Sequence, residues 1–323
     1  MKRPRPLLAL AATLAVAVPT ILFGSSAAHA DPISQTSGFY VNPQSSPARW
    51  AAANPGDGRA NAIRTQIAQK PMASWFGNWS GDITSAVRNY VSAADAADKL
   101  PLLVAYNLPG RDACGGHSGG GAGSVAAYDA WTSAFAGAIG NRPAVVVLEP
   151  DALGDFNCMS QARINERVGM LSRAINQFRS RAANTWVYLD AGNPGWVDAW
   201  TMSQRLNMAG VGNARGFALN VSNYVTTGEN TNYGNTVSNN LRNSFGYSKP
   251  FVIDTSRNGN GSNGQWCNPG GRRIGTPTQL GGGAEMLLWL KTPGESDGNC
   301  GVGGGSSAGQ FLPEVAYKMI FGY

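Results

Sequence analysis

Two acidic residues, Glu149 and Asp151, directly follow an unbroken apolar run over Ala144–Leu148. The run is rich in β-branched valine, which is typical of a strand buried on both faces of a parallel sheet. Pro150 cannot donate a ladder hydrogen bond, so we expect the strand to end there. Active sites in α/β proteins lie at the carboxyl ends of strands, so this pair is a candidate acid/base centre. The alternative is that both residues only cap the next helix or pair with an arginine.

Other apolar runs also end in polar residues that could join this centre. They are Tyr106 and Asp112, Asp190, Asn220, Asp254, and the group Lys291, Glu295 and Asp297. The carboxyl ends of parallel strands meet at one rim, so we expect these side chains to converge there. The alternative is that they cap helices or pair with Arg111 and Arg257. Capping or pairing would explain one such residue, but it explains the whole set less well.

Histidine and cysteine usage narrows the possible chemistry. The chain has only two histidines, His29 and His117, so a cluster of histidine ligands is excluded. His29 lies in the predicted signal peptide described below, so a Ser-His-Asp triad would depend on His117 alone. We therefore expect carboxylates to act as acid and base, without a metal or organic cofactor. The cysteines lack the C-x-x-C spacing of zinc sites, and their even number in a secreted chain indicates two disulfides with three possible pairings: Cys114, Cys158, Cys267 and Cys300.

The first 30 residues have the pattern of a secretory signal peptide. Three basic residues precede an apolar run from Leu7 to Phe23, and Ala28-His29-Ala30 is a cleavage site before Asp31. A retained membrane anchor is the alternative, but the run is short for a span and is interrupted by Pro19. Removing Lys2, Arg3 and Arg5 lowers the formal charge from +6 to +3. The remaining basic residues are scattered, so we expect a secreted protein without nucleic-acid or membrane partners.

Strand-like and helix-like stretches alternate along residues 31–323, after a polar segment over 31–45 that we expect to be loosely held. This alternation predicts a parallel sheet with right-handed crossovers, closed or nearly closed into a (β/α) barrel of about seven strands. An open doubly wound sheet is the alternative. We see one domain without a linker or appended module. The expected strands are 73–79, 102–107, 145–149, 186–190, 217–221, 251–254 and 286–290, and the expected helices are 83–99, 125–139, 161–181, 196–208 and 237–245.

Six segments, in order and over roughly residues 35–323, resemble glycoside hydrolase family 6, a family of secreted cellulases with a distorted β/α barrel. They are VAYNLPGRD (104–112), VVVLEPDALG (145–154), YLDAG (188–192), FVIDTSRNGNG (251–261), QWCNP (265–269) and WLKTPGESDG (289–298).

The resemblance implies a role for each acidic position. Asp151 would be the general acid, and Asp112 would raise the pKa of that acid through its negative charge. Tyr106 would press on the sugar in the cleavage subsite and favour a distorted ring, while Asp190 would support the site by hydrogen bonding. Asp297 is the usual candidate for the base, and a water chain involving Asp112 is the competing view.

The resemblance also implies binding residues and a disulfide pattern. Trp75, Trp196 and Trp266 match positions that stack glucosyl rings, and we also assign Asn220, Lys291 and Glu295 to substrate binding. Trp50, Trp131, Trp186 and Trp200 have no such match, and we expect them to be packing residues. Pairing of neighbouring cysteines would give Cys114–Cys158 and Cys267–Cys300. The chain departs from the family pattern at two positions, with Ala113 inserted after Asp112 and Asn193 in place of a histidine.

These features together predict a secreted, monomeric endo-β-1,4-glucanase that hydrolyses internal bonds of cellulose with inversion. Endo action is preferred because processive members carry longer loops, whereas this chain is short. The alternatives are a hydrolase of another β-glucan, an exo-cellulase that releases cellobiose, and a carbohydrate-binding protein without catalysis.

Overall fold

The computed structural model describes Met1 and residues 31–115 and 119–323. Residues 2–30, which carry the predicted signal peptide, lie outside this part of the chain. None of the helices in the described part is both long and apolar enough to cross a membrane.

A curled sheet of eight strands forms the centre of the molecule, with the strand order β1-β2-β3-β4-β5-β6-β8-β7. Seven of these strands run parallel, and only the short β7 pairs antiparallel with β8. The seven parallel strands follow chain order across the sheet, without the reversal that a doubly wound sheet requires. The expectation of a distorted barrel of about seven parallel strands is therefore confirmed. The strands are β1 (Ser74–Phe76), β2 (Leu102–Ala105), β3 (Ala144–Leu148), β4 (Thr185–Asp190), β5 (Gly216–Leu219), β6 (Phe251–Asp254), β7 (Gln279–Leu280) and β8 (Met286–Leu288).

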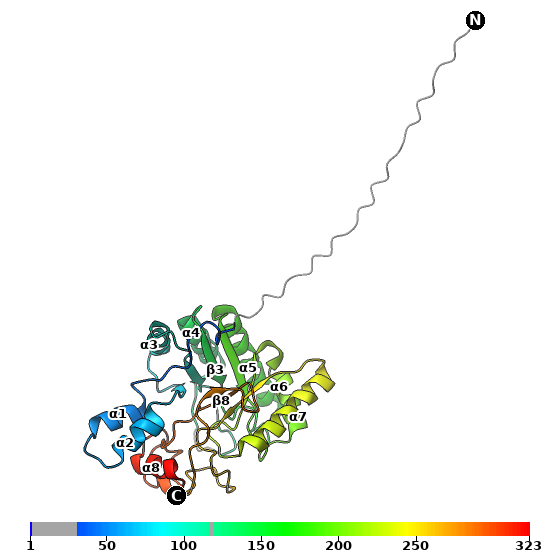
Figure 1. Cartoon of the computed structure of the whole chain (residues 1–323). Helices are drawn as coiled ribbons and strands as arrows, with labels where there is room; N and C mark the ends of the chain where they lie inside the picture. The colour runs from blue at the N-terminus through cyan, green and yellow to red at the C-terminus, as the bar shows by residue number, and fades with distance from the viewer. Residues whose placement is uncertain (2–30, 116–118) are drawn as a thin grey trace.

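The five crossover helices each begin at a side chain that accepts a hydrogen bond from a backbone N–H of the first turn, which is why polar residues in the sequence mark their starts. In Figure 1 these helices lie around the central strands. Helix α7 begins well before the predicted residue 237, at a capping box formed by Thr226 and Glu229. The helices and their caps are α3 (Ile83–Ala96, Asp82), α4 (Val125–Ile139, Ser124), α5 (Gln161–Arg181, Ser160), α6 (Ala199–Met208, Asp198) and α7 (Thr227–Phe245, Thr226).

The apolar strands have two buried faces, which accounts for their unbroken apolar sequence. In β3, Val146 and Leu148 pack toward the helices, while Val145 and Val147 face the barrel interior. Successive side chains of a strand point to opposite faces, so both layers draw on the same run. This packing fixes β3 tightly up to the residue before Glu149.

Three further helices were not predicted from the sequence: α1 (Ser46–Ala53), α2 (Ala60–Ile63) and α8 (Pro313–Phe321). Helix α2 continues into a π-helical turn, η1 (Arg64–Ala68), and two short 3₁₀ helices occur at η2 (Val211–Asn213) and η3 (Gly301–Gly303). Figure 1 shows α8, near the C-terminus, beside α2, which in turn contacts α1. Residues from α2, η1 and α8 pack around the fully buried Trp289.

The segment 31–45 is held more firmly than expected. Tyr40 is buried, and its backbone N–H donates to Leu100 O at 2.9 Å. The N–H of Leu100 donates in turn to Gly38 O at 2.7 Å. The expectation of a loose segment is therefore wrong for residues 37–40, because they pair with the chain that leads into β2.

The barrel has a seam between β1, at one end of the sheet, and the β8–β7 pair at the other, and β1 shares no ladder with either strand in the described part of the chain. Two single hydrogen bonds cross this seam. The N–H of Ala73 donates to Trp289 O at 2.9 Å, and Nε1 of Trp75 donates to Leu290 O at 2.7 Å. Trp75 is thus fixed at the open edge of the sheet.

Candidate active site

A cleft of about 1270 Å³ opens at the carboxyl ends of the parallel strands. It brings together residues that are far apart in the sequence, including several of the acidic residues predicted to meet there. Asp112 and Asp151, the two carboxylates on which the sequence prediction depends, both line it. The other predicted site residues in its wall are Tyr106, Trp75, Trp196, Trp266, Lys291, Glu295 and Asp297.

Asp151 lies just beyond β3, in a loop whose backbone is turned by its positive φ of 70°. Its N–H donates to Oδ2 of Asp190, at the end of β4, at 2.9 Å. Burial, followed by the charges of Asp190 and Asp112, raises the pKa of the Asp151 carboxyl well above its usual range. The carboxyl therefore keeps a proton that it can donate into the cleft.

Asp190 lies behind Asp151 and outside the cleft wall, with 1% of its surface exposed. Its Oδ2 also accepts from the N–H of Gly192 at 3.2 Å, whereas its buried Oδ1 has no hydrogen-bond partner among the described residues. Burial raises the pKa of Asp190 to about 7. Asp190 therefore holds the backbone of Asp151 in place, and its charge helps to raise the pKa of the Asp151 carboxyl.

Glu149 does not reach the cleft, which corrects the interpretation of Glu149 and Asp151 as an acid/base pair. Its carboxylate is fully buried and accepts from the N–H of Asn107 at 3.0 Å and of Leu108 at 2.9 Å. Burial raises the pKa of Glu149 to about 7. The side chain thus fixes the start of the loop that leads to Asp112.

The Asp112 loop is held from several sides. Nη1 of Arg111 donates to Tyr106 O at 3.2 Å and to Oδ1 of Asn78 at 3.3 Å. A disulfide joins Cys114 to Cys158, which follows β3, with 5.5 Å between their Cα atoms. The loops after β2 and β3 are therefore linked covalently, and each carries one of the two predicted acidic residues.

Asp297 is buried in a cluster of hydrogen-bond donors. Nη1 of Arg257 lies 3.0 Å from both carboxylate oxygens, and Nζ of Lys291 lies 3.8 Å from Oδ1. Tyr224 Oη donates to Oδ2 at 3.2 Å. Burial alone would raise the pKa of Asp297, but the charges of Arg257 and Lys291 outweigh it and hold that pKa below its usual value. Asp297 is thus ionised, and both of its carboxylate oxygens already interact with neighbouring side chains.

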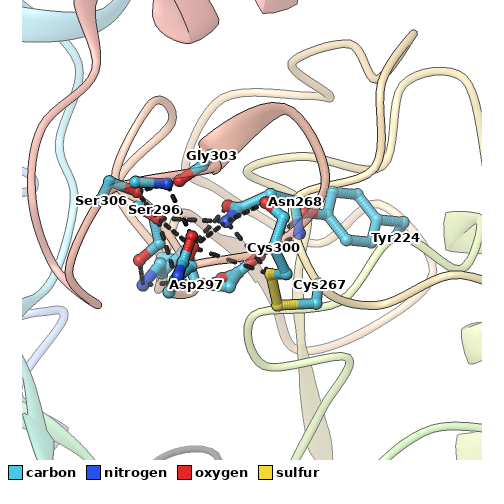
Figure 2. The surroundings of a disulfide bond; sticks show 12 residues. Tyr224, Cys267, Asn268, Ser296, Asp297, Cys300, Gly303 and Ser306 are labelled. Atoms are coloured by element: carbon cyan, nitrogen blue, oxygen red, sulfur yellow. Dashed lines mark hydrogen bonds and ion pairs between the residues drawn. A yellow bond between two sulfur atoms is a disulfide. The ribbon is translucent and has the colours of Figure 1, made fainter.

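Asn268 joins the loop of Trp266 to the loop of Asp297. Its N–H donates to Oδ2 of Asp297 at 3.1 Å, and its Oδ1 accepts from the N–H of Asp297 at 2.8 Å. Its Nδ2 donates to Ser296 Oγ and to Gly298 O. Figure 2 shows this network beside the Cys267–Cys300 disulfide, so the two loops are fastened twice.

Three tryptophans present rings to the cleft at the predicted positions. Trp75 meets the ring of Tyr106 edge-on, with 5.4 Å between centroids. The ring of Trp196 lies over Gly154, where an added Cβ would come within 2.3 Å of it. Trp196 and Trp266 are each more than two-fifths exposed. Such rigid apolar surfaces suit the faces of pyranose rings.

Non-glycine residues with positive φ gather around this cleft. The described part of the chain contains seven, and all except Asp98 lie in loops that follow the strands at this end: Asp112, Glu149, Asp151, Asn220, Ser222 and Asn268. Such conformations are uncommon and cluster at functional sites, where the surrounding structure maintains them.

A family model described as glycosyl hydrolases family 6 matches residues 34–321. The chain belongs to glycosyl hydrolase family 6. It is therefore a glycoside hydrolase, and the cleft at the strand ends is its candidate catalytic site.

Several family 6 proteins resemble the chain along most of its length. Endoglucanase 1 of Streptomyces halstedii is 66% identical over 308 residues, which cover 95% of this chain and 96% of that protein. Endoglucanase A of Cellulomonas fimi is 46% identical over 88% of this chain and 61% of its own length. The solved endoglucanase Cel6 of Mycobacterium tuberculosis, in complex with methyl-cellobiosyl-4-deoxy-4-thio-β-D-cellobioside, superposes with a TM-score of 0.82. It is 37% identical and covers 91% of this chain and 99% of its own.

The two departures from the family 6 pattern are accommodated locally. The insertion of Ala113 leaves the Cys114–Cys158 pairing intact, and both predicted disulfides are confirmed. Asn193 lines the cleft, and its Oδ1 accepts from the N–H of Gly195 at 3.0 Å. The remaining histidine, His117, lies outside the described residues.

Two predicted roles in this family 6 site need correction. Asn220 is fully buried, and its amide bonds only backbone, donating to Asp254 O at 2.8 Å and accepting from Val225 N–H at 3.0 Å. It therefore holds a loop and does not contact substrate. Trp200 was expected to pack, but 61% of its surface is exposed on α6. By contrast, Trp186 is buried, and Trp50 and Trp131 pack against core clusters.

Sequence analysis missed two residues of this site. Trp79 lines the cleft with more than half of its surface exposed, although it was assigned only to the end of a strand. Asn268 was part of the QWCNP motif, but it received no role. A signal of a constrained loop was available in the sequence. Asn268 is preceded by Trp266 and by Cys267, a predicted disulfide partner, and is followed by Pro269.

Proposed function

We propose that the protein is a secreted endo-β-1,4-glucanase that hydrolyses internal bonds of cellulose with inversion. The observation that carries this proposal is that Asp151, Asp112 and Tyr106 line the same cleft, together with exposed tryptophans. The raised pKa of the Asp151 carboxyl supports its role as general acid. Relatives named endoglucanases, and a solved relative bound to a cellobiosyl thio-cellobioside, support a β-glucan substrate.

In the proposed reaction, Asp151 donates its proton to the glycosidic oxygen as the bond to the anomeric carbon breaks. A water molecule attacks that carbon from the opposite face of the ring, so the configuration inverts. Tyr106, in the wall beside Asp112, presses on the ring and favours its distortion toward the oxocarbenium-like transition state. The attacking water loses a proton as the new bond forms. When a proton returns to Asp151, the enzyme is restored to its starting state.

We assign the removal of that proton to Asp112, acting through water, in preference to Asp297. The carboxylate of Asp297 already accepts from Arg257, Asn268 and Tyr224, and its lowered pKa makes it a weak proton acceptor. Asp112 and Asp151 interact through their charges. Asp297 instead supplies a fixed negative charge at the cleft wall.

Viscometry of carboxymethylcellulose, followed alongside reducing-sugar release, tests endo action. We expect viscosity to fall before much sugar appears, and we expect NMR of early products to show the α-anomer. Release of cellobiose with little loss of viscosity would indicate an exo-cellulase. Preferential cleavage of a mixed-linkage glucan would indicate another β-glucanase, and unchanged oligosaccharide after long incubation would indicate a binding protein without catalysis.

A further inference from the structure

We propose that Trp79 forms a sugar-stacking site beside Tyr106, at which the indole ring binds a glucosyl unit of a β-1,4-glucan. This inference rests on the proposed function, because it requires a glucan chain in the cleft. It adds a binding residue that the sequence motifs did not indicate.

The backbone turn after β1 fixes the position of the Trp79 ring. The N–H of Gly77 donates to Oγ of Ser80 at 3.0 Å, and the N–H of Ser80 donates to Gly77 O at 3.0 Å. The indole lies so close to Gly77 that an added Cβ there would come within 2.4 Å of a ring carbon and 2.6 Å of Tyr106 O. Glycine at position 77 thus allows the ring to lie against the backbone of the turn, next to Tyr106.

The surroundings of Trp79 connect it to the predicted cleavage site. The guanidinium carbon of Arg111 lies 5.4 Å from the centroid of Trp79 and 4.5 Å from that of Tyr106. The Trp79 and Tyr106 rings lie 6.4 Å apart at 60°. Because Trp75 also meets Tyr106 edge-on, the tyrosine ring contacts tryptophans from both β1 and the turn that follows it.

These contacts leave 55% of Trp79 exposed, within the wall of the cleft. No described residue accepts a hydrogen bond from its indole Nε1. Trp79 adds to the exposed apolar surface that Trp196 and Trp266 present in the cleft wall, and a ligand bound there can cover this surface. A pyranose offers an apolar face for the ring and hydroxyls that can accept from Nε1. Exposure alone does not identify a binding site, because Trp200 is more exposed than Trp79 but does not line the cleft.

Binding of cellotetraose and cellohexaose, measured by titration calorimetry in an Asp151→Ala background, tests the proposal. Replacing Trp79 with alanine or leucine should weaken binding of at least the longer oligosaccharide by roughly five- to ten-fold, because aromatic stacking is lost. Trp79→Phe should stay within about two-fold of the parent, because it keeps an aromatic face. Thermal melting should be nearly unchanged in the leucine and phenylalanine variants.

Kinetics in the otherwise wild-type enzyme separate this role from mere support of Tyr106. A stacking site predicts a raised KM for Trp79→Leu with a smaller change in kcat, and recovery in Trp79→Phe. A lowered kcat with unchanged KM and unchanged oligosaccharide affinity would overturn the inference while leaving the proposed function intact. If the Asp151→Ala parent binds neither oligosaccharide and the wild type does not cleave them, both proposals fail.

Discussion

The backbone N–H of Asp151 lies 2.9 Å from Oδ2 of Asp190, so the end of β4 fixes the loop that carries the proposed acid. The same contact brings a second carboxyl group close to the first, in a buried setting. Burial and the charge of Asp190 both favour the protonated form of Asp151. The contact with Asp190 therefore contributes to both the position and the protonation of this residue.

Asp151→Ala should lower hydrolysis of carboxymethylcellulose by at least roughly 100-fold, because general acid catalysis contributes about that much or more. The variant should melt at or above the wild-type temperature, since a carboxyl in an unfavourable buried site is removed. Asp129→Ala is the matched control, because Asp129 pairs with Arg173 on the helical surface. Near-normal turnover by Asp151→Ala would refute its assignment as the acid.

Asp112→Asn should move the alkaline limb of the kcat/KM profile to lower pH. Asp151 must be protonated to act, so activity falls as pH rises through its pKa. The negative charge of Asp112 helps to raise that pKa, and its removal lowers it. A pH series on a soluble cellooligosaccharide measures the limb. An unchanged limb in a variant with residual activity would contradict the charge coupling.

Asp297→Asn should destabilise the protein by about 3–5 kcal/mol at neutral pH, because it leaves the buried charge of Arg257 without its partner. The pKa of Asp297 is lower in the folded protein than in the unfolded chain. Its contribution to stability is therefore present above the ordinary aspartate pKa and is lost as pH falls through the lowered value.

Denaturant unfolding of wild type and Asp297→Asn across acidic pH tests this linkage. The stability difference should shrink as the solution is acidified. A difference that stays constant down to the lowest pH would show that Asp297 does not act through its charge. The activity of the variant, compared at temperatures where it remains folded, reports separately on catalysis.

Replacing Cys267 and Cys300 together with serine should remove about 4 kcal/mol in the chain-entropy model, since the bond closes a loop with a sequence separation of 33. We expect a fall in Tm of roughly 10 °C. The hydrogen bonds of Asn268 still join the two loops in this variant. At temperatures where it is folded, it should therefore keep measurable activity, and combining it with Asn268→Ala should lower activity further. Full activity in the combined variant would argue against a role for this connection.

The sequence was sufficient to predict the parallel strands and most helix starts, because apolar runs and polar caps are local signals. It also predicted that Asp112, Asp151 and Asp297 line one cleft. The helices α1, α2 and α8 escaped prediction because they are short and are stabilised by packing around Trp289, which joins segments from opposite ends of the chain. Local patterns carry no information about such packing.

The orientation of individual side chains was harder to predict. Glu149 and Asp151 were expected to act together because both directly follow the end of the same strand. In a regular strand, residues two positions apart would also face the same side. Positive φ values at both residues break that regularity, and only Asp151 reaches the cleft. The binding role predicted for Asn220 was wrong because its amide is used by backbone groups, one at Asp254 and one at Val225 in its own loop.

The seam between β1 and the β8–β7 pair removes a constraint that a closed barrel would impose. Full closure ties the circumference to the number and stagger of the strands. Here the two sides meet through isolated hydrogen bonds from the backbone N–H of Ala73 and the side chain of Trp75, so no ladder sets their spacing. The groove can accordingly be widened or narrowed by substitutions along these two edges, which makes the seam the natural place to re-engineer which polymers the enzyme accepts.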